Sequence, residues 1–172
     1  MQQLRIKTEK EENTAIKSCV FTGHRLLEQD FSPKKLKTAV QEAILQGVET
    51  FYNGMAMGFD LVAASALISL KERYPQIRLI ACVPFYGQEK KFPKKWQDAY
   101  TNAISRFDET VVLSQHYFDG CYFKRNDYMI DCADLLFAYC VRAQGGTAYT
   151  VRSFIRKKGE ENVLFFESNP FL

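Results

Sequence analysis

The chain has 172 residues, 47% of them hydrophobic and 25% charged, with a net charge of +3. This length fits one domain with its own core, and the small, dispersed charge argues against a nucleic-acid partner. No apolar run approaches the about 18 residues that a membrane span needs, and residues 1–17 lack a signal-peptide core, so we expect a cytoplasmic protein without a membrane partner. Five cysteines without a CxxC pair indicate reduced, packed thiols and no metal site.

Strand and helix patterns alternate along most of the chain. Residues 1–15 are charged and without periodicity, so we expect a flexible tail there and one domain over residues 16–172. In chain order, the patterns predict strand 18–22, a helix opening at Ser32-Pro33, strand 50–53, helix 60–73, strand 77–83, helix 94–106, strand 110–113, helix 122–132, strand 135–140, helix 147–158 and strand 162–166.

The predicted strands are apolar throughout, which is typical of a sheet covered on both faces. Strands that alternate with helices predict an α/β fold, here a Rossmann-like, mostly parallel sheet in a single domain. In such a sheet, ligands bind beyond the carboxyl ends of the strands, where the strand order reverses.

Two glycine turns each join a predicted strand to a predicted helix. They are Asn53 to Asp60, with Gly54 and Gly58, and Gly145-Gly146-Thr147. Such turns point backbone N–H groups and the positive end of the helix dipole at one place, which suits a phosphate. We therefore expect the main-chain amides of both turns to converge on a shared pocket for an anionic metabolite, with Thr147 as helix cap and phosphate donor.

The loop after the first strand reads Gly23-His24-Arg25. Gly23 allows a sharp turn, after which Arg25 is placed to bind a phosphate bidentately and His24 to donate to the same ligand. A purely structural alternative is that His24 is satisfied within its loop and Arg25 pairs with Glu28 or Asp30.

The turn after the second strand offers further ligand contacts. Gly54 and Gly58 permit close approach of a ligand to the backbone beside Asn53. Met57 suits an apolar base pocket, although core packing is the commoner role of methionine. We expect Asp60 to cap the following helix, with ordering of the loop or a contact to a ribose hydroxyl as the alternative.

Aromatic residues follow the third strand in Pro84-Phe85-Tyr86, where the rings could stack on a base. Later in the chain, Arg125 and Asn126 near a helix start are candidates for contacts to phosphate and ribose. The alternative for Arg125 is a surface ion pair with Asp119 or Asp131.

The order of these motifs resembles that of the SLOG superfamily, in particular its YpsA-like branch. The resemblance rests on Thr22-Gly23-His24-Arg25, Gly54-x-x-x-Gly58-x-Asp60, Arg125-Asn126-x-x-Met129 and Gly145-Gly146-Thr147, and it covers about residues 17–166. It implies a Rossmann-like sheet that binds nucleotides or nucleotide-derived metabolites, with phosphate near Gly145, Gly146 and Thr147. Related members include cytokinin-activating phosphoribohydrolases, DNA-processing proteins that bind single strands, and sensors of NAD-derived signals.

The phosphoribohydrolases of this superfamily carry a catalytic glutamate three residues after the threonine, where this chain has Thr150. The resemblance therefore favours binding without turnover of an NAD, ADP-ribose or cyclic-nucleotide type of ligand, by a sensor or a sequestering protein of the kind that blunts nucleotide-based anti-phage defence. No cofactor is required. The alternatives are a nucleoside 5′-monophosphate phosphoribohydrolase using Asp60 or Asp131, and a module for single-stranded nucleic acid or a protein partner. A homo-oligomer is also open.

Overall fold

The computed structural model describes residues 16–172, so the predicted tail at 1–15 lies outside the described residues. It confirms a Rossmann-like α/β domain with six strands and five α-helices in this range. In chain order these are β1 (Ser18–Gly23), α1 (Pro33–Leu45), β2 (Thr50–Asn53), α2 (Phe59–Arg73), β3 (Arg78–Val83), the 3₁₀ turn η1 (Gln88–Lys91), α3 (Lys94–Arg106), β4 (Glu109–Val112), α4 (Cys121–Cys132), β5 (Leu135–Tyr139), α5 (Gly146–Lys158), the 3₁₀ turn η2 (Glu160–Asn162) and β6 (Val163–Phe165).

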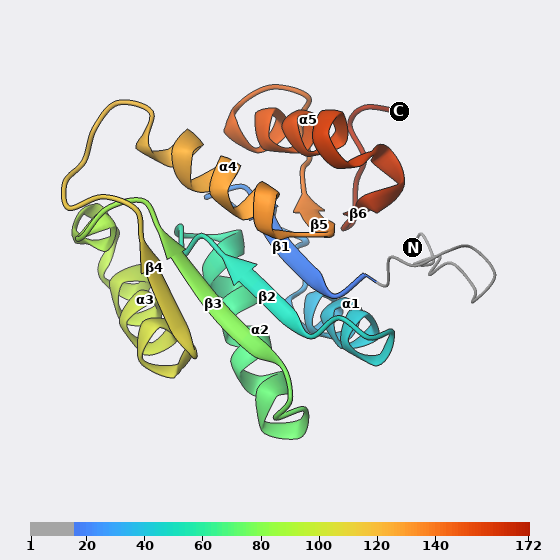
Figure 1. Cartoon of the computed structure of the whole chain (residues 1–172), viewed down its shortest axis with the longest axis horizontal. Coiled ribbons are helices and arrows are strands. Elements are labelled where there is room, and N and C mark those ends of the chain that lie inside the picture. The colour runs from blue at the N-terminus through green and yellow to red at the C-terminus, as the bar shows by residue number, and fades with distance from the viewer. Residues whose placement is uncertain (1–15) are drawn as a thin grey trace.

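The sheet is parallel throughout, with the strand order β4-β3-β2-β1-β5-β6. From β1 the chain builds outward through β2, β3 and β4, and then returns to add β5 and β6 on the other side of β1 (Figure 1). The strand order therefore reverses between β1 and β5. This is the switch point at which open α/β sheets bind their ligands.

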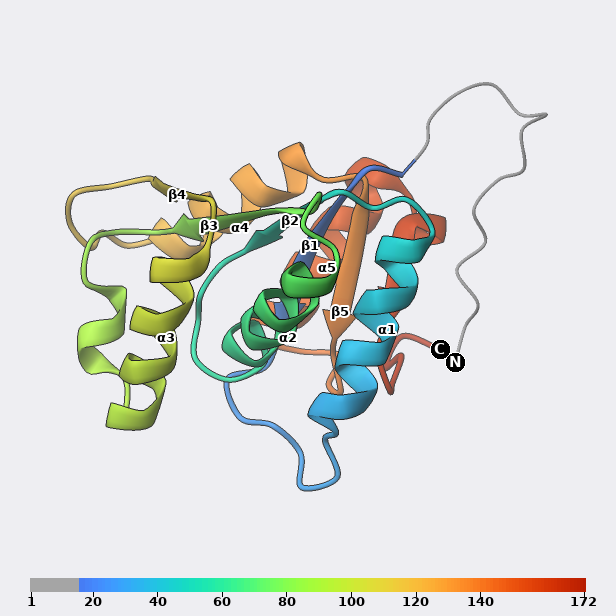
Figure 2. The same ribbon diagram turned by 90° about the horizontal axis from the view of Figure 1, so that it is seen from below.

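Alternating side chains of each strand divide the core into two layers. In β5, Leu135, Phe137 and Tyr139 pack with α1, α2 and α3, whereas Leu136 and Ala138 pack with α4 and α5. Figure 2 shows α1, α2 and α3 in front of the sheet and α4 and α5 behind it. Burial on both faces explains why the strands are apolar throughout and why their pattern predicted a parallel sheet.

The helix starts differ from the prediction in a way that affects the site. Ser32 caps α1 as expected, since its hydroxyl accepts a hydrogen bond from Lys35 N–H at 3.2 Å. In contrast, α2 begins after Gly58 and α5 after Gly145, and neither has a side-chain cap. The predictions that Asp60 and Thr147 are N-caps were wrong, because both residues already lie inside the first helical turn.

Residues 16–172 contain neither a membrane-spanning helix nor a cluster of metal ligands. None of the helices in this range is long and apolar enough to cross a membrane. The same part of the chain holds no group of three or more histidine, cysteine or acidic side chains placed to bind a metal ion.

Candidate functional site

Three loops meet at the carboxyl edge of the sheet, and His24 joins them. Its carbonyl oxygen accepts a hydrogen bond from Phe59 N–H at 3.1 Å, which ties the loop after β1 to the start of α2. Its Nε2 accepts a hydrogen bond from Val141 N–H at 3.0 Å, which ties the same loop to the segment after β5. The structure therefore brings the loops of β1, β2 and β5 together at the switch point.

The hydrogen bond from Val141 fixes the state of the His24 ring. Because Nε2 accepts this bond, the proton of the neutral ring is on Nδ1. Burial lowers the pKa of His24, and the nearby Arg142 lowers it further, so the neutral form is favoured. Only Nδ1–H of His24 can therefore donate to a ligand. Nε2 is used within the protein, as in the alternative prediction that His24 has a purely structural role.

Arg125 connects the two glycine turns through a chain of hydrogen bonds. Its Nη1 donates to the carbonyl oxygen of Gly54, and its Nε donates to Oδ1 of Asn126 at 2.8 Å. Asn126 Nδ2 donates to the hydroxyl of Thr150 at 3.1 Å, and this hydroxyl donates to the carbonyl oxygen of Gly146 at 3.1 Å. The turns after β2 and β5, about ninety residues apart in sequence, are thereby linked.

The charge of Arg125 is buried without a carboxylate in direct contact, although the nearby Asp60 partly compensates it. The side chain is only 5% exposed, and among the described residues it has no carboxylate within 4 Å, so the predicted alternative of a surface pair with Asp119 or Asp131 was wrong. Burial lowers the pKa of Arg125 from its ordinary value, which expresses the cost of placing this cation away from water. Only two of the five guanidinium N–H groups have a partner in the described part of the chain. A guanidinium in this position favours an anion as ligand.

The glycines after β1 and β2 make room for protein, not for a ligand. A Cβ atom on Gly23 would lie 2.3 Å from the Phe59 ring, and one on Gly54 would lie 2.8 Å from the guanidinium carbon of Arg125. Gly58 has a φ of +84°, and a Cβ there would lie 2.3 Å from the carbonyl oxygen of Arg25. The prediction that Gly54 and Gly58 admit a ligand is corrected accordingly, because side chain and backbone of this chain already occupy that space.

Asn53 and Asp60 order the same turn. The fully buried Asn53 side chain accepts a hydrogen bond from Met55 N–H and donates to the carbonyl oxygen of Asp60, so it is used within the turn and is not free to bind a ligand as predicted. Oδ2 of Asp60 accepts a hydrogen bond from Ala56 N–H at 3.3 Å, which supports the loop-ordering alternative. Half-buried Met57 lies in this turn as well.

The other oxygen of Asp60, Oδ1, is buried without a hydrogen-bond partner. Burial raises the pKa of Asp60 to about 6, and the opposing effect of Arg125 is smaller. At this pKa the carboxyl group of Asp60 is mostly ionised near physiological pH, and its protonated fraction grows as the pH falls toward 6.

The turn after β5 has open space around it. Gly145 and Gly146 are exposed, and a Cβ atom added to either would meet no other atom within 4 Å. Helix α5 has no side-chain cap and no acidic residue in its first turn, so the N–H groups of Gly146, Thr147 and Ala148 point out of the helix without an intrahelical acceptor. Of the two glycine turns, this one alone has the space that a phosphate requires.

Aromatic side chains surround the arginines of this edge. The guanidinium carbons of Arg25 and Arg125 lie 5.5 Å and 5.9 Å from the centroid of the Tyr122 ring, an arrangement typical of cation–π contacts. Phe85 packs edge-on against Tyr122, whereas Tyr86 is exposed and Pro84 is buried. Phe85 therefore packs against the same Tyr122 ring that Arg25 contacts. Of the predicted group Pro84-Phe85-Tyr86, Tyr86 is the exposed member. The role of Tyr122 was missed, because aromatic residues in a helix give no signal of contact with two distant arginines.

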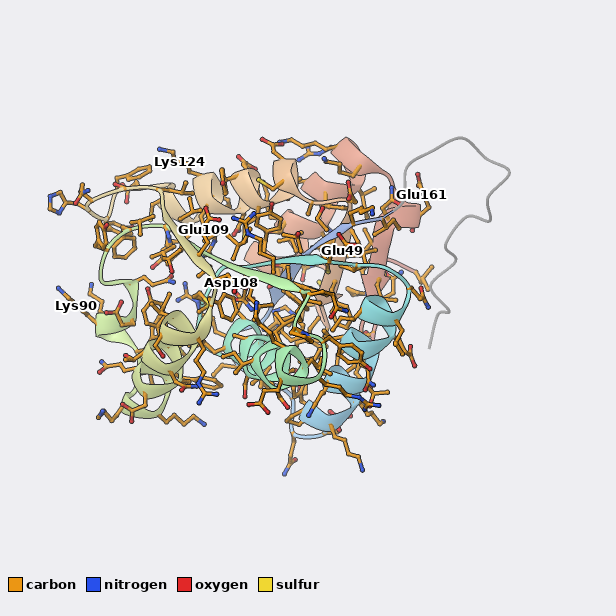
Figure 3. The ribbon with its side chains drawn as sticks, turned by 60° about the horizontal axis from the view of Figure 1, so that its bottom comes forward. Glu49, Lys90, Asp108, Glu109, Lys124 and Glu161 are labelled. Carbon is orange, nitrogen blue, oxygen red and sulfur yellow. The ribbon has the colours of Figure 1, made fainter. Side chains whose placement is uncertain are left out.

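Figure 3 shows charged side chains at both edges of the sheet. At the carboxyl edge, Lys124 lies near the start of α4 and Lys90 in the turn after β3. At the amino edge, Glu49 precedes β2, and Asp108 and Glu109 lie just before and at the start of β4. These three carboxylates pair with Lys17, Lys71 and Arg78, so their charges are compensated locally.

Two features lie away from the assembled loops. Asp131 is exposed in the last turn of α4, at the opposite end of the helix from Arg125, and pairs with Lys157 at 3.2 Å; the structure therefore does not bring this candidate to the site. An open groove of about 670 Å³ lies between the first turn of α1 and the C-terminal segment, lined by Lys34, Lys35, Thr38 and residues 165–169 and 172, and contains none of the predicted site residues.

The parallel sheet, its switch point and the three loops together define a Rossmann-like α/β protein, and comparison with known proteins gives the family. Residues 20–166 match the YpsA family model, described as the YspA SLOG family, and the chain belongs to this family. Its relatives include the UPF0398 protein YpsA of Bacillus subtilis, 26% identical over 131 residues that cover 74% of this chain and 73% of that protein. A UPF0398 protein of Staphylococcus epidermidis is 33% identical over 108 residues, covering 62% and 55%.

Among solved structures, the chain is similar to DNA processing protein A from Helicobacter pylori, studied for its single-stranded DNA binding mode. The TM-score is 0.62 at 16% identity, and the alignment covers 90% of this chain and 67% of the other. This likeness supports the shared fold.

Proposed function

We propose that this protein binds a phosphorylated nucleotide or nucleotide-derived metabolite at the carboxyl edge of its sheet. The phosphate would be bound by the free N–H groups at the start of α5 and by the buried guanidinium of Arg125. The observation that carries the proposal is the chain of hydrogen bonds that links a buried, unpaired arginine to the one glycine turn with open space around it.

The ligand class follows from the size and charge of this edge. Arg25 stands beside Arg125 on the Tyr122 ring, so a second anionic group, as in ADP-ribose or NAD, has a partner within the same cluster. In the place of the catalytic glutamate of the related hydrolases, the hydroxyl of Thr150 is used in the link between Asn126 and Gly146. Capture of the nucleotide by a sensor or sequestering protein, without turnover, is therefore the preferred form of the proposal.

Isothermal titration calorimetry with AMP, NAD, ADP-ribose and cyclic nucleotides tests this proposal. At least one should bind, and Arg125→Met should weaken binding at least tenfold, because the variant keeps the apolar stem of the side chain but removes the charged guanidinium. Arg78→Met is the matched control, since Arg78 is exposed and pairs with Glu109 at the other edge of the sheet. Equal affinity of the Arg125→Met variant would exclude this residue from the site.

Chromatography of the same mixtures distinguishes binding from hydrolysis. The nucleoside 5′-monophosphate phosphoribohydrolase alternative predicts release of free base, abolished by Asp60→Asn, because Asp60 is the predicted carboxylate that the structure brings to these loops. Recovery of unchanged nucleotide after prolonged incubation supports capture.

Single-stranded DNA is a second candidate ligand, despite the small net charge. Its support is the fold shared with a protein studied for single-stranded DNA binding, together with the exposed rings of Tyr86, Tyr117 and Phe118 at this edge. Fluorescence anisotropy of a labelled oligothymidylate, repeated at rising salt, tests it. Binding that falls steeply with salt would favour this candidate over a free nucleotide.

A further inference from the structure

An exposed pair of aromatic rings lies at the entrance to the proposed phosphate site. Phe123 in the first turn of α4 and Tyr149 in the first turn of α5 are 48% and 42% exposed. Their ring centroids are 4.8 Å apart and their planes meet at 74°, an edge-to-face contact between two helices. The two rings in contact form a small aromatic surface that is accessible from solvent.

The pair is connected to the site by helix geometry. Tyr149 follows Gly146 by three residues, and its N–H donates to the carbonyl oxygen of Gly145 at 3.0 Å. Helical side chains lean toward the N-terminus of their helix, so the Tyr149 side chain is directed toward the turn in which Gly145 and Gly146 lie, and the space beside these glycines stays open. Asn126 lies one turn after Phe123 in α4 and donates a hydrogen bond to Thr150 in α5. The contact between these two helices therefore contains both the ring pair and the hydrogen bond from Asn126 to Thr150.

We propose that Phe123 and Tyr149 form the base-stacking surface for the nucleotide, an inference that rests on the proposed function. Two rings at a steep angle offer one face on which a planar base stacks and a second ring against its edge. The ligand would then place its phosphate at Gly146 and its aromatic base on the rings outside. This assigns the base to a site different from Pro84-Phe85-Tyr86, where Phe85 is already packed against Tyr117 and Tyr122.

Calorimetry with AMP and ribose 5-phosphate tests the assignment, because the two ligands share the sugar phosphate and differ in the base. AMP should bind the native protein more tightly than ribose 5-phosphate. Tyr149→Ala and Phe123→Ala should each weaken AMP by about tenfold, the usual effect of losing one stacked ring, and leave ribose 5-phosphate unchanged. Tyr149→Phe should keep native affinity, because stacking needs the ring and not the hydroxyl.

Leu45→Ala is the matched control for loss of an exposed apolar side chain, since Leu45 is 67% exposed at the far end of α1. Circular dichroism of each variant confirms that it is folded. The inference is overturned if both alanine variants bind AMP like the native protein, or if Tyr86→Ala alone weakens AMP. It is also overturned if AMP and ribose 5-phosphate bind the native protein equally, in which case the phosphate site still stands. Failure of AMP, NAD, ADP-ribose and the cyclic nucleotides alike to bind would instead refute the proposed function.

Discussion

Asp60 is a buried carboxyl group whose surroundings shift its protonation equilibrium toward the neutral form. It is 6% exposed, one of its oxygens lacks a partner, and burial raises its pKa to about 6 from a value of 3.8. Between these two values the folded protein binds more protons than the unfolded chain does, so the contribution of this group to stability decreases as pH rises. The contribution is fully present below about pH 4 and is lost above about pH 6.

The variant Asp60→Asn should therefore be more stable than the native protein at pH 7.5 and equally stable near pH 4. A difference of about two pKa units corresponds to roughly 3 kcal/mol, which we take as the upper limit of the gain at pH 7.5. The variant should also bind AMP more tightly, because a negative charge beside Arg125 has been removed. Urea unfolding at both pH values and calorimetry check this.

Weaker AMP binding by Asp60→Asn would contradict this account. It would show instead that the carboxylate contacts the ligand, as expected of a residue that bonds a ribose hydroxyl.

For single residues, the sequence predicted which ones lie at the site but did not predict the groups that they contact. Arg125, His24 and Asp60 were all selected from motifs, and all lie at the carboxyl edge. Their partners could not be predicted, because the bond from Val141 N–H to His24 joins segments 117 residues apart. The burial of Arg125 likewise depends on the β2 turn, 71 residues away, that accepts its hydrogen bond.

At the start of α5, a single substitution is expected to affect protein stability and ligand binding in opposite directions. Its first residue, Gly146, has open space where a side chain would lie, at an uncapped N-terminus without acidic neighbours in the first turn. A carboxylate there interacts favourably with the helix dipole, by about 0.3–1 kcal/mol, and also occupies the place proposed for the phosphate.

Gly146→Asp should consequently unfold at the same or a slightly higher temperature than the native protein and lose AMP binding. Gly146→Asn is the neutral control of nearly equal size, and its affinity should lie between the two. Thermal unfolding with and without AMP measures both properties. Native affinity in the aspartate variant would place the phosphate elsewhere.

The boundaries of the elements show where local sequence was sufficient. Helix α3 and strand β2 have the predicted bounds, because their apolar spacing and flanking residues are unambiguous. The starts of α2 and α5 were each predicted one residue too late, and the N-cap of each was assigned to the wrong residue. A glycine N-cap has no side chain that would identify it in the sequence. At α5 the glycine N-cap also leaves backbone N–H groups free at the site, whereas at α2 the N–H of Phe59 donates to the carbonyl oxygen of His24.

For the whole molecule, the parallel sheet and its two layers followed from alternation of strand and helix patterns. The expectation of one shared pocket stays a prediction: the structure links Gly54 and Gly146 by hydrogen bonds, and Arg125 takes the space beside Gly54. The sequence could not predict this, because the residue that fills the space beside Gly54 comes from a helix 71 residues away. Because hydrogen bonds link these loops, we expect a ligand bound at one of them to stabilise the other as well.

Binding of AMP should therefore slow amide hydrogen exchange both in residues 141–149, which contact the proposed phosphate, and in residues 53–60, which do not. The Thr150 hydroxyl is the link, because it accepts from Asn126 and donates to the carbonyl oxygen of Gly146. Thr150→Val keeps the shape of this buried side chain and removes both hydrogen bonds, at a cost of about 1–3 kcal/mol. In this variant AMP should still protect residues 141–149 and should protect residues 53–60 less than in the native protein, because only the hydrogen bond from Arg125 to the Gly54 carbonyl oxygen then connects the phosphate to that turn. Residues 34–45 of α1 provide the internal control, and native-like protection of both segments in the variant would show that the turns respond to the ligand independently of Thr150.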